Sequence, residues 1–428
     1  MTVRWMFVTG AVSLVVACGE GEQSAQPAEA AMAAPGDQST EPGGPPMGMN
    51  DPMGTDPAPS GDPNQGDGDP GAPPLDDPAM VDDSDPLPVD GAGGAPADDA
   101  QAGAGGQGDP APPMLKPPEE LEIAEYDIPD LPGCNNSFPH DPAVDEATGL
   151  VYYADSNNSC IGEFNPETME FRAWPTPTPD SYPHGLVVVD GSRVAYTGAD
   201  ADTIGVLDPK AGTIEDYPVD ANRPHTPTWH QGKVWFTAQN GGQYGHFDVD
   251  TGEFEVFDFS SGQTGPYGIW PAPDGSLWVA LFGTNRLGHI VTSDPPVLEE
   301  VELPSAGSRP RRLTVDSQGK VWYTDYPREK LGRFDPAAAE GMGVTEWDTS
   351  PQGGRGYGIA LGPDGNVWFD NQDQTELVGF NPGTAEVVAR LPRSDGSTGP
   401  VRNISVDMVR NRIWLAISNV GQMGVVQF

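Results

Sequence analysis

Aromatic residues are missing from a long stretch of this 428-residue chain, since residues 19–118 contain no Phe, Trp or Tyr. Basic residues are scarce throughout: 21 Lys and Arg stand against 64 Asp and Glu, for a formal net charge of −43. Such a charge repels the phosphates of nucleic acids and of anionic lipids. We therefore exclude DNA and RNA as partners and attribute most of the charge to solubility.

Only three cysteines are present, and the first lies in an export signal. Arg4 gives this signal a positive start, and residues 5–16 form an apolar segment too short to span a bilayer. The following sequence, Leu14-Val15-Val16-Ala17-Cys18, resembles a bacterial lipobox. That resemblance implies removal of residues 1–17 and attachment of lipid to Cys18, with an ordinary secretory peptide as the alternative. Gly19, in place of an Asp, favours the outer membrane, on its periplasmic or surface side.

The other two cysteines, Cys134 and Cys160, flank the first of the repeats described below. Two cysteines left over in an exported protein favour a disulfide. No Cys-x-x-Cys-His motif occurs, which excludes c-type haem, and two thiols alone do not make a zinc site.

Residues 18–118 are predicted to form a disordered acidic tether, with 19 acidic residues and one lysine, Lys116. Their Gly, Pro, Ala and Asp content cannot bury enough apolar surface to offset the entropy lost on ordering. Repeated Asp-Pro pairs disfavour helix and strand alike. An expanded coil of this length spans about 50–60 Å, so it would hold the domain at residues 119–428 away from the membrane.

From residue 121 onward the chain repeats at a period of about 42–46 residues, which is typical of four-stranded propeller blades. The second strand of each repeat is apolar and mostly aromatic, as in Val321-Trp322-Tyr323-Thr324. The third strand carries a glycine, as in Lys330-Leu331-Gly332, and Gly, Asp or Asn turns separate the strands. Seven such repeats predict an all-β, seven-bladed β-propeller.

The two ends of the repeat region predict how the ring closes. The seventh repeat stops at Phe428 after its third strand, and an unmatched strand at residues 121–129 precedes the first repeat. We expect this strand to complete the seventh blade, because closure removes the free strand edges. Since such a ring needs no partner to fold, we expect a monomer.

The start of the first strand in each repeat faces the central channel of a propeller. Reading this position around the repeats gives the channel column: His140, His184, His225, Tyr267, Arg311, Tyr357 and Arg402. The column contains no acid although the chain is acidic. Polar, titratable groups that converge on a channel are typical of a ligand site, and a polar channel filled with water is the alternative.

The loop after the second strand offers a second set of residues on the same face, and only Asp155 and Asp325 in it are acidic. Asp155 belongs to the same repeat as His140 and is the candidate metal ligand. Hard cations prefer several converging oxygens, so these two acids alone do not predict a shared metal site.

Three stretches resemble the virginiamycin B (streptogramin B) lyase family: Pro183-His184-Gly185, Val234-Trp235-Phe236-Thr237 and Leu331-Gly332-Arg333-Phe334-Asp335. The resemblance covers residues 121–428. It implies an elimination that linearises a cyclic depsipeptide, in which a base removes a proton beside the ester carbonyl and Mg²⁺ polarises that carbonyl.

His184 and His225 match the family's catalytic histidine pair, and His140 with His184 is a second possible pair. The metal-binding glutamates of the family are not matched. Tyr182 and Arg223 stand two residues before the histidines, and Gly198 and Ala238 end the corresponding second strands.

The sequence therefore favours a lipid-anchored propeller that binds a small molecule, peptide or glycan at its channel face. The alternative is a metal-dependent C–O lyase with Mg²⁺ as cofactor.

Overall fold

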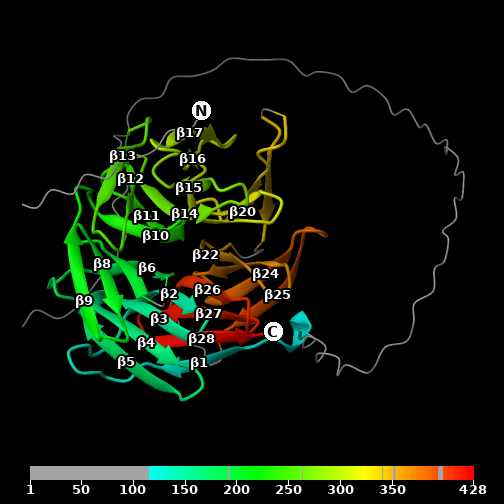
Figure 1. The fold of residues 1–428 in the computed structure, drawn as a ribbon. Coiled ribbons are helices and arrows are strands. Elements are labelled where there is room, and N and C mark those ends of the chain that lie inside the picture. Colours follow the sequence, from blue (N-terminus) through cyan, green and yellow to red (C-terminus); the bar gives the residue numbers. More distant parts are fainter. Residues whose placement is uncertain (1–114, 191–192, 263, 340, 350–352, 394–398) are drawn as a thin grey trace, which may run out of the picture. The chain divides into compact units, whose positions relative to one another are not determined.

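The computed structural model describes residues 115–190, 193–262, 264–339, 341–349, 353–393 and 399–428. These residues form seven four-stranded antiparallel sheets arranged as the blades of a propeller (Figure 1). The predicted signal peptide, Cys18 and the tether up to residue 114 lie outside the described residues. Among the residues described, no helix has the length and hydropathy needed to cross a membrane.

The blades are numbered in chain order. Their innermost strands are β2 (Pro139–Asp145), β6 (Pro183–Val189), β10 (Pro224–His230), β14 (Pro266–Pro271), β18 (Pro310–Val315), β22 (Gly356–Leu361) and β26 (Val401–Asp407). The second strands are β3 (Leu150–Asp155), β7 (Arg193–Gly198), β11 (Lys233–Ala238), β15 (Leu277–Leu281), β19 (Val321–Asp325), β23 (Val367–Asn371) and β27 (Arg412–Ile417).

The third strands are β4 (Cys160–Asn165), β8 (Thr203–Asp208), β12 (Gln243–Phe247), β16 (Arg286–Val291), β20 (Lys330–Phe334), β24 (Glu376–Asn381) and β28 (Gln422–Gln427). The outer strands are β5 (Glu170–Pro175), β9 (Thr213–Pro218), β13 (Phe254–Asp258), β17 (Val297–Glu302), β21 (Val344–Asp348), β25 (Glu386–Pro392) and β1 (Ile123–Asp127). Two 3₁₀ turns, η1 (Pro118–Glu120) and η2 (Ser156–Asn158), accompany them.

The predicted ring closure is confirmed. Strand β1 pairs antiparallel with β28, from Ile123 opposite Val426 to Asp127 opposite Gln422. The seventh blade therefore combines the first strand of the domain with its last three, in the order β1-β28-β27-β26. The expected seven-bladed, all-β architecture is correct.

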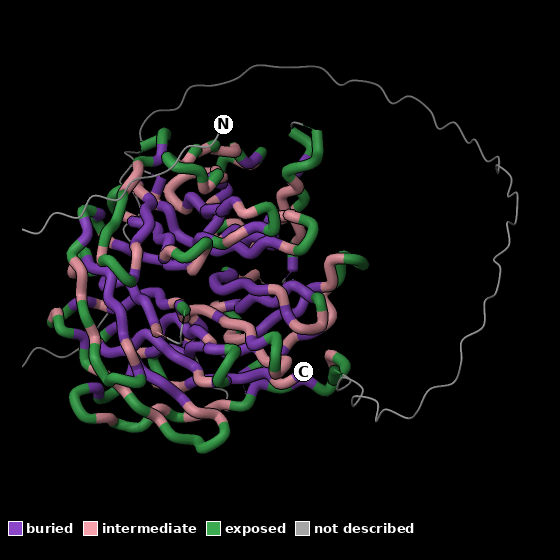
Figure 2. The backbone as a smooth tube through the Cα atoms, in the orientation of Figure 1, coloured by how far each residue is buried: buried purple, intermediate pink, exposed green. Residues whose placement is uncertain are grey.

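The core is divided into seven hydrophobic clusters, one between each pair of neighbouring blades. Trp368 of β23 packs against Ile404 and Leu415 of the seventh blade. Trp414 of β27 packs in the same way against Val151 of the first. Figure 2 shows this pattern as buried inner strands and exposed outer loops. Alternating apolar side chains on both faces of each blade thus hold the ring together.

In five of the seven blades, the third-strand glycine makes room for an aromatic ring of the second strand. A Cβ atom at Gly332 would overlap the ring of Tyr323, the residue opposite it in the neighbouring strand. The repeat keeps glycine here because no side chain fits under the ring.

We expect Gly332→Ala to lower the free energy of unfolding by about 1–3 kcal/mol, since the added methyl forces Tyr323 out of its packed position. Urea denaturation would measure the loss. Gly307→Ala is the matched control, because a Cβ there meets only Cδ of Arg328, at 3.8 Å. Equal effects of the two substitutions would contradict this explanation of the glycine.

Candidate functional site at the central channel

A backbone irregularity at the start of each innermost strand positions the channel column. The pairing of the first and second strands shifts register there in every blade, for example between Pro139 and Pro142 and between Pro183 and Leu186. An extra residue in one strand re-aims the side chains next to it. The column residues lie in these bulges.

In five of the seven blades, a hydroxyl side chain donates a hydrogen bond to the innermost strand of the next blade. Thr237 Oγ1 accepts a hydrogen bond from Thr226 N (3.2 Å) and donates one to the carbonyl of Tyr267 in the following blade (2.8 Å). Ser418 closes the series by donating to the carbonyl of Pro139 (2.6 Å). These bonds tie the backbone of the column between neighbouring blades at five places around the ring.

Six of the seven column residues are buried, and Arg402 is partly exposed. The imidazole rings of His140 and His184 lie 4.0 Å apart between centroids, and those of His184 and His225 lie 3.6 Å apart. Tyr267 follows at 4.0 Å from His225. The structure therefore brings these column residues together, and they fill the space around the axis.

The other side of the column is built around Arg311. Its guanidinium lies 4.2 Å from the ring centroid of Tyr357 and 4.8 Å from that of Tyr267, and it donates a hydrogen bond to the Tyr267 hydroxyl (3.0 Å). The two tyrosine hydroxyls also hydrogen-bond to each other. Phe282 and Tyr326 add two further rings around Arg311. Cation–π contacts of this kind stabilise a buried guanidinium.

An ion pair that sequence analysis missed crosses the channel. Nη2 of Arg312, in the fifth blade, lies 2.9 Å from both carboxylate oxygens of Asp141, in the first. Both side chains are buried. Each follows a column residue, at a position that is glycine in Gly185, Gly268 and Gly358. A charge where other repeats keep glycine is the sequence signal that could have revealed the pair.

Asp141 also fixes the protonation of His140. Its Oδ1 lies 2.9 Å from His140 Nδ1. An ionised carboxylate can only accept hydrogen bonds, so Nδ1 carries the proton and Nε2 of the neutral ring keeps its lone pair.

All three histidines of the column are held neutral. Burial lowers the pKa of His140, His184 and His225 well below the usual value, and nearby arginines lower it further. For His140 the largest of these charge effects comes from Arg402. Burial works against the charge of Arg312, but the Asp141 carboxylate and the phenols of Tyr357 and Tyr267 together outweigh it, and the pKa of Arg312 is raised. The site is therefore a region of positive potential with neutral imidazoles at its centre.

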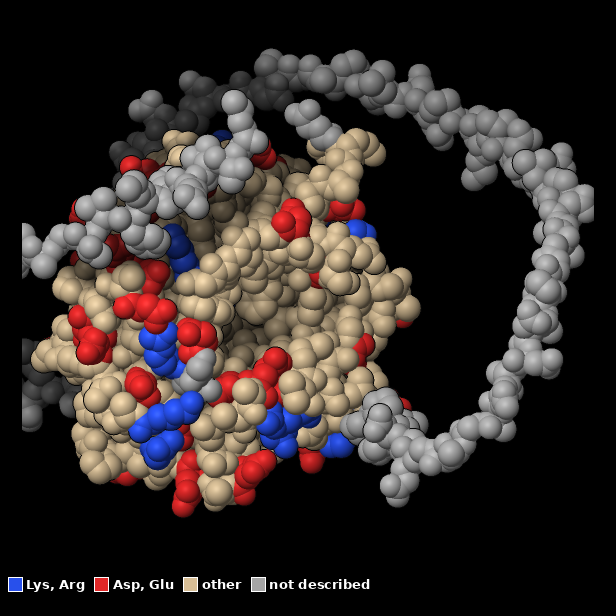
Figure 3. All heavy atoms as spheres, viewed as in Figure 1, with Lys and Arg blue, Asp and Glu red and all other residues tan. Residues whose placement is uncertain are grey.

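Partly buried aromatic and basic residues surround the column. Tyr182 lies 6.4 Å from His184 between ring centroids, and the guanidinium of Arg223 lies 5.6 Å from the Tyr182 ring. Arg402 lies 5.8 Å from the ring of Phe138. On the face shown in Figure 3, the ring is hollowed between the blades and charged side chains gather on the surrounding surface.

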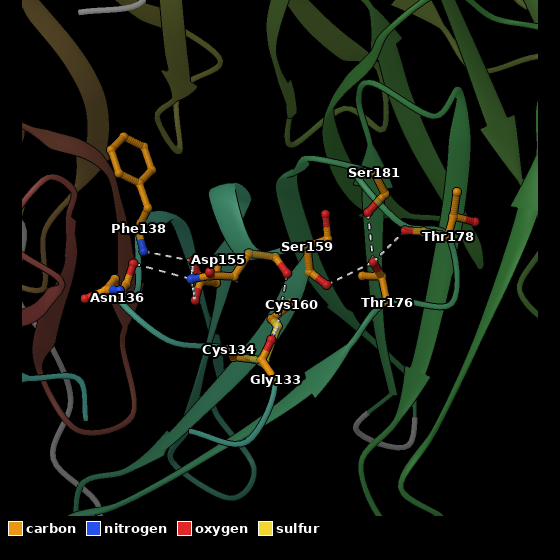
Figure 4. The surroundings of a disulfide bond; sticks show 11 residues. Gly133, Cys134, Asn136, Phe138, Asp155, Ser159, Cys160, Thr176, Thr178 and Ser181 are labelled. Atoms are coloured by element: carbon orange, nitrogen blue, oxygen red, sulfur yellow. Dashed lines mark hydrogen bonds between the residues drawn. A yellow bond between two sulfur atoms is a disulfide. The ribbon is translucent and has the colours of Figure 1, made fainter. Parts of the chain in front are cut away.

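Asp155, the candidate metal ligand, has its oxygens engaged in the loop before β2. It accepts hydrogen bonds from Phe138 N (2.8 Å) and from Nδ2 of Asn158 (3.1 and 3.0 Å), as Figure 4 shows in part. Asp325 occupies the same position in the fifth blade and accepts from Arg309 N in the same way (2.9 Å). These contacts give both acids a structural role in their loops.

The donor set does not fit Mg²⁺. Among the described residues, the group of titratable side chains that could hold a metal is His140, Asp141 and His184, which offers two nitrogens and one carboxylate. Mg²⁺ requires oxygen ligands, and imidazoles suit zinc or copper instead. Asp141 is already neutralised by Arg312, and Arg311 and Arg402 oppose a further positive charge.

The two remaining cysteines are joined. Cys134 and Cys160 form a disulfide that attaches the segment after β1 to β4 (Figure 4). The bond lies beside the loop that carries Asp155, so it restrains the entrance of the chain into the first blade.

Asp370 is a buried acid at the position where other blades have Thr197, Thr237 and Thr324. Its Oδ1 accepts a hydrogen bond from Tyr357 N (3.0 Å), and its Oδ2 has no partner among the described residues. Burial raises the pKa of Asp370 to about 8.

At pH values above the ordinary pKa of an aspartate, the folded protein therefore keeps a proton on Asp370, whereas the unfolded chain releases it. The contribution of Asp370 to the free energy of unfolding therefore falls as the pH rises toward 8. We expect Asp370→Thr to flatten that decline, so that melting temperatures at pH 5 and pH 8 differ less than in the wild type. An unchanged pH dependence would contradict the raised pKa.

We expect Asp141→Asn to destabilise the fold by about 3–5 kcal/mol, because it leaves the Arg312 charge buried without a partner. Adding Arg312→Met should recover much of that loss. Chemical denaturation of the two single variants and the double variant gives the coupling free energy directly. If the double variant lost as much free energy of unfolding as the two single variants lose together, the pair would not be coupled.

The comparisons with known proteins agree with this architecture. The model of the Virginiamycin B lyase family matches residues 120–388. A virginiamycin B lyase from Staphylococcus aureus superposes with a TM-score of 0.65 at 21% identity, over 72% of this chain and 100% of that one. A streptogramin B lyase structure gives a TM-score of 0.64 at 21% identity, over 73% of this chain and 99% of that one.

A catalytically inactive histidine-to-alanine variant of the Staphylococcus aureus virginiamycin B lyase with quinupristin gives a TM-score of 0.64 at 20% identity, over 72% of this chain and 100% of that one. No curated protein matches the chain. These structural similarities show the fold, and the family model covers well over half of the chain. The chain therefore belongs to the virginiamycin B lyase family.

Proposed function

We propose that this protein binds a small molecule, peptide or glycan at the channel face of its propeller. The observation that carries the proposal is the convergence of the channel column: three neutral imidazoles, two tyrosines and two arginines meet at one place. Partly exposed aromatic and basic side chains surround this centre, which is the composition of a ligand site.

The proposal includes a location. The lipobox-like sequence ending in Cys18 and the acidic tether support an exported lipoprotein held at the outer membrane. On this view the propeller meets its ligand outside the cytoplasm, as a monomer.

We expect ligands of this face to raise the melting temperature of the full chain, purified from membranes in detergent. A panel of small carboxylates, short peptides and oligosaccharides would be screened by thermal shift. Tyr182→Ala should remove the shift because Tyr182 lies beside His184, whereas Tyr217→Ala, on the outer strand β9 of the same blade, should keep it. If the melting-temperature shift persisted in Tyr182→Ala and disappeared in Tyr217→Ala, the ligand site would lie elsewhere.

The second candidate is a C–O lyase, favoured by the close neutral histidines on neighbouring blades. His140 Nε2 keeps a lone pair that can accept a proton from carbon, and His184 and His225 are the pair suggested by the family motif. The column supplies no magnesium ligands, so no step of such a reaction is assigned to that ion here.

Incubation of the full chain with quinupristin, with and without EDTA, tests the lyase directly. Linear product, detected by mass spectrometry and lost in His140→Ala, would establish the activity. An unaltered cyclic compound after prolonged incubation would leave binding as the function.

A further inference from the structure

The rim of the channel between the seventh and second blades carries a cation without a counter-charge. Arg402 forms no ion pair with any residue that the structure describes, and its buried Nε has no hydrogen-bond partner. The neighbouring arginines are used differently: Arg223 pairs with Asp200, and Arg312 pairs with Asp141. Arg402 is therefore the positive charge still available to a ligand.

The overall charge of the chain does not explain why Arg402 lacks a counter-charge. With three acidic residues for every basic one, random placement would put carboxylates near Arg402. Asp141, which follows the column residue His140, is instead directed to Arg312 on the far side of the channel. The repulsion of a divalent cation and the attraction of an anion both follow from this arrangement.

One aromatic ring contacts the unpaired cation, and a second, Tyr182, lies close enough for the charge of Arg402 to act on its hydroxyl. Phe138 lies under the guanidinium of Arg402 at 5.8 Å, and Tyr182 lies 6.4 Å from His184. Both are partly exposed, while the histidines beneath them are buried. A flat, apolar group can stack on such rings while its charge pairs with the arginine. The Nδ1 atom of His184 is buried without a partner and offers a further polar contact.

We propose that the rim formed by Phe138, Tyr182 and Arg402 binds an aromatic carboxylate, with Arg402 as its charge partner. This inference rests on the proposed ligand-binding function and names the chemical class of the ligand. The carboxylate forms a charge-assisted, two-point contact with the guanidinium, and the ring system contacts Phe138 and Tyr182.

The test uses full-length protein, purified from membranes in detergent, and two probes of the same shape: naphthalene-2-carboxylate and its neutral amide, naphthalene-2-carboxamide. Titration calorimetry or ligand-observed NMR gives Kd for each. We expect the carboxylate to bind at least about tenfold more tightly than the amide.

Arg402→Gln should remove the preference for the carboxylate, while the amide binds as before. Arg412→Gln is the matched control, since this arginine of the same blade bonds to Gln427 away from the column (2.6 Å). Equal binding of both probes, unaffected by Arg402→Gln, would overturn the carboxylate site and leave the ligand-binding face intact. Absence of binding by either probe, together with no hit in the wider thermal-shift panel, would overturn the proposed function as well.

Discussion

Strand β1 hydrogen-bonds to β28, so the first strand of the domain completes its last blade, and every other feature of the ring depends on that pairing. Without it the seventh blade would present an open edge, and the first and seventh blades would be joined by side-chain packing and a few hydrogen bonds such as that of Ser418 to Pro139. Closure sets the number of blades, and the number of blades sets how far apart the inner strands lie. The channel column can converge because seven inner strands surround a narrow axis.

The inner strands bring many polar side chains into the small space around the channel axis. Neutral imidazoles, phenols and a guanidinium enclosed by rings pack against one another there, and the ion pair of Asp141 and Arg312 crosses the channel beside them. Buried charges persist only when paired, so this pair restricts how the inner strands can move relative to one another. The result is a rigid floor below a rim whose side chains are partly exposed, which is where a ligand can be recognised without reorganising the core.

Much of this arrangement could be predicted from sequence, because every blade repeats the same pattern of residues and such a pattern can be recognised. The period, the aromatic second strands, the glycines under them and the unmatched strand at residues 121–129 all have local signatures. The column was found for the same reason. Contacts across the channel are harder to predict: a charge replaces glycine at Asp141 and at Arg312, but the two are 171 residues apart and neither repeat shows which side chain is the partner. Asp155 shows the converse limit, since an acid near a predicted site can serve only its own loop.

The position of the Cys134–Cys160 disulfide has a mechanical consequence. A pull on the chain before β1 loads the seam between β1 and β28 first, because that strand is the entry to the domain. If the seam opened, the chain would be released only as far as Cys134, where the covalent bond to β4 transfers the load to the first blade. The disulfide thus limits how much of the chain the opening of this seam releases.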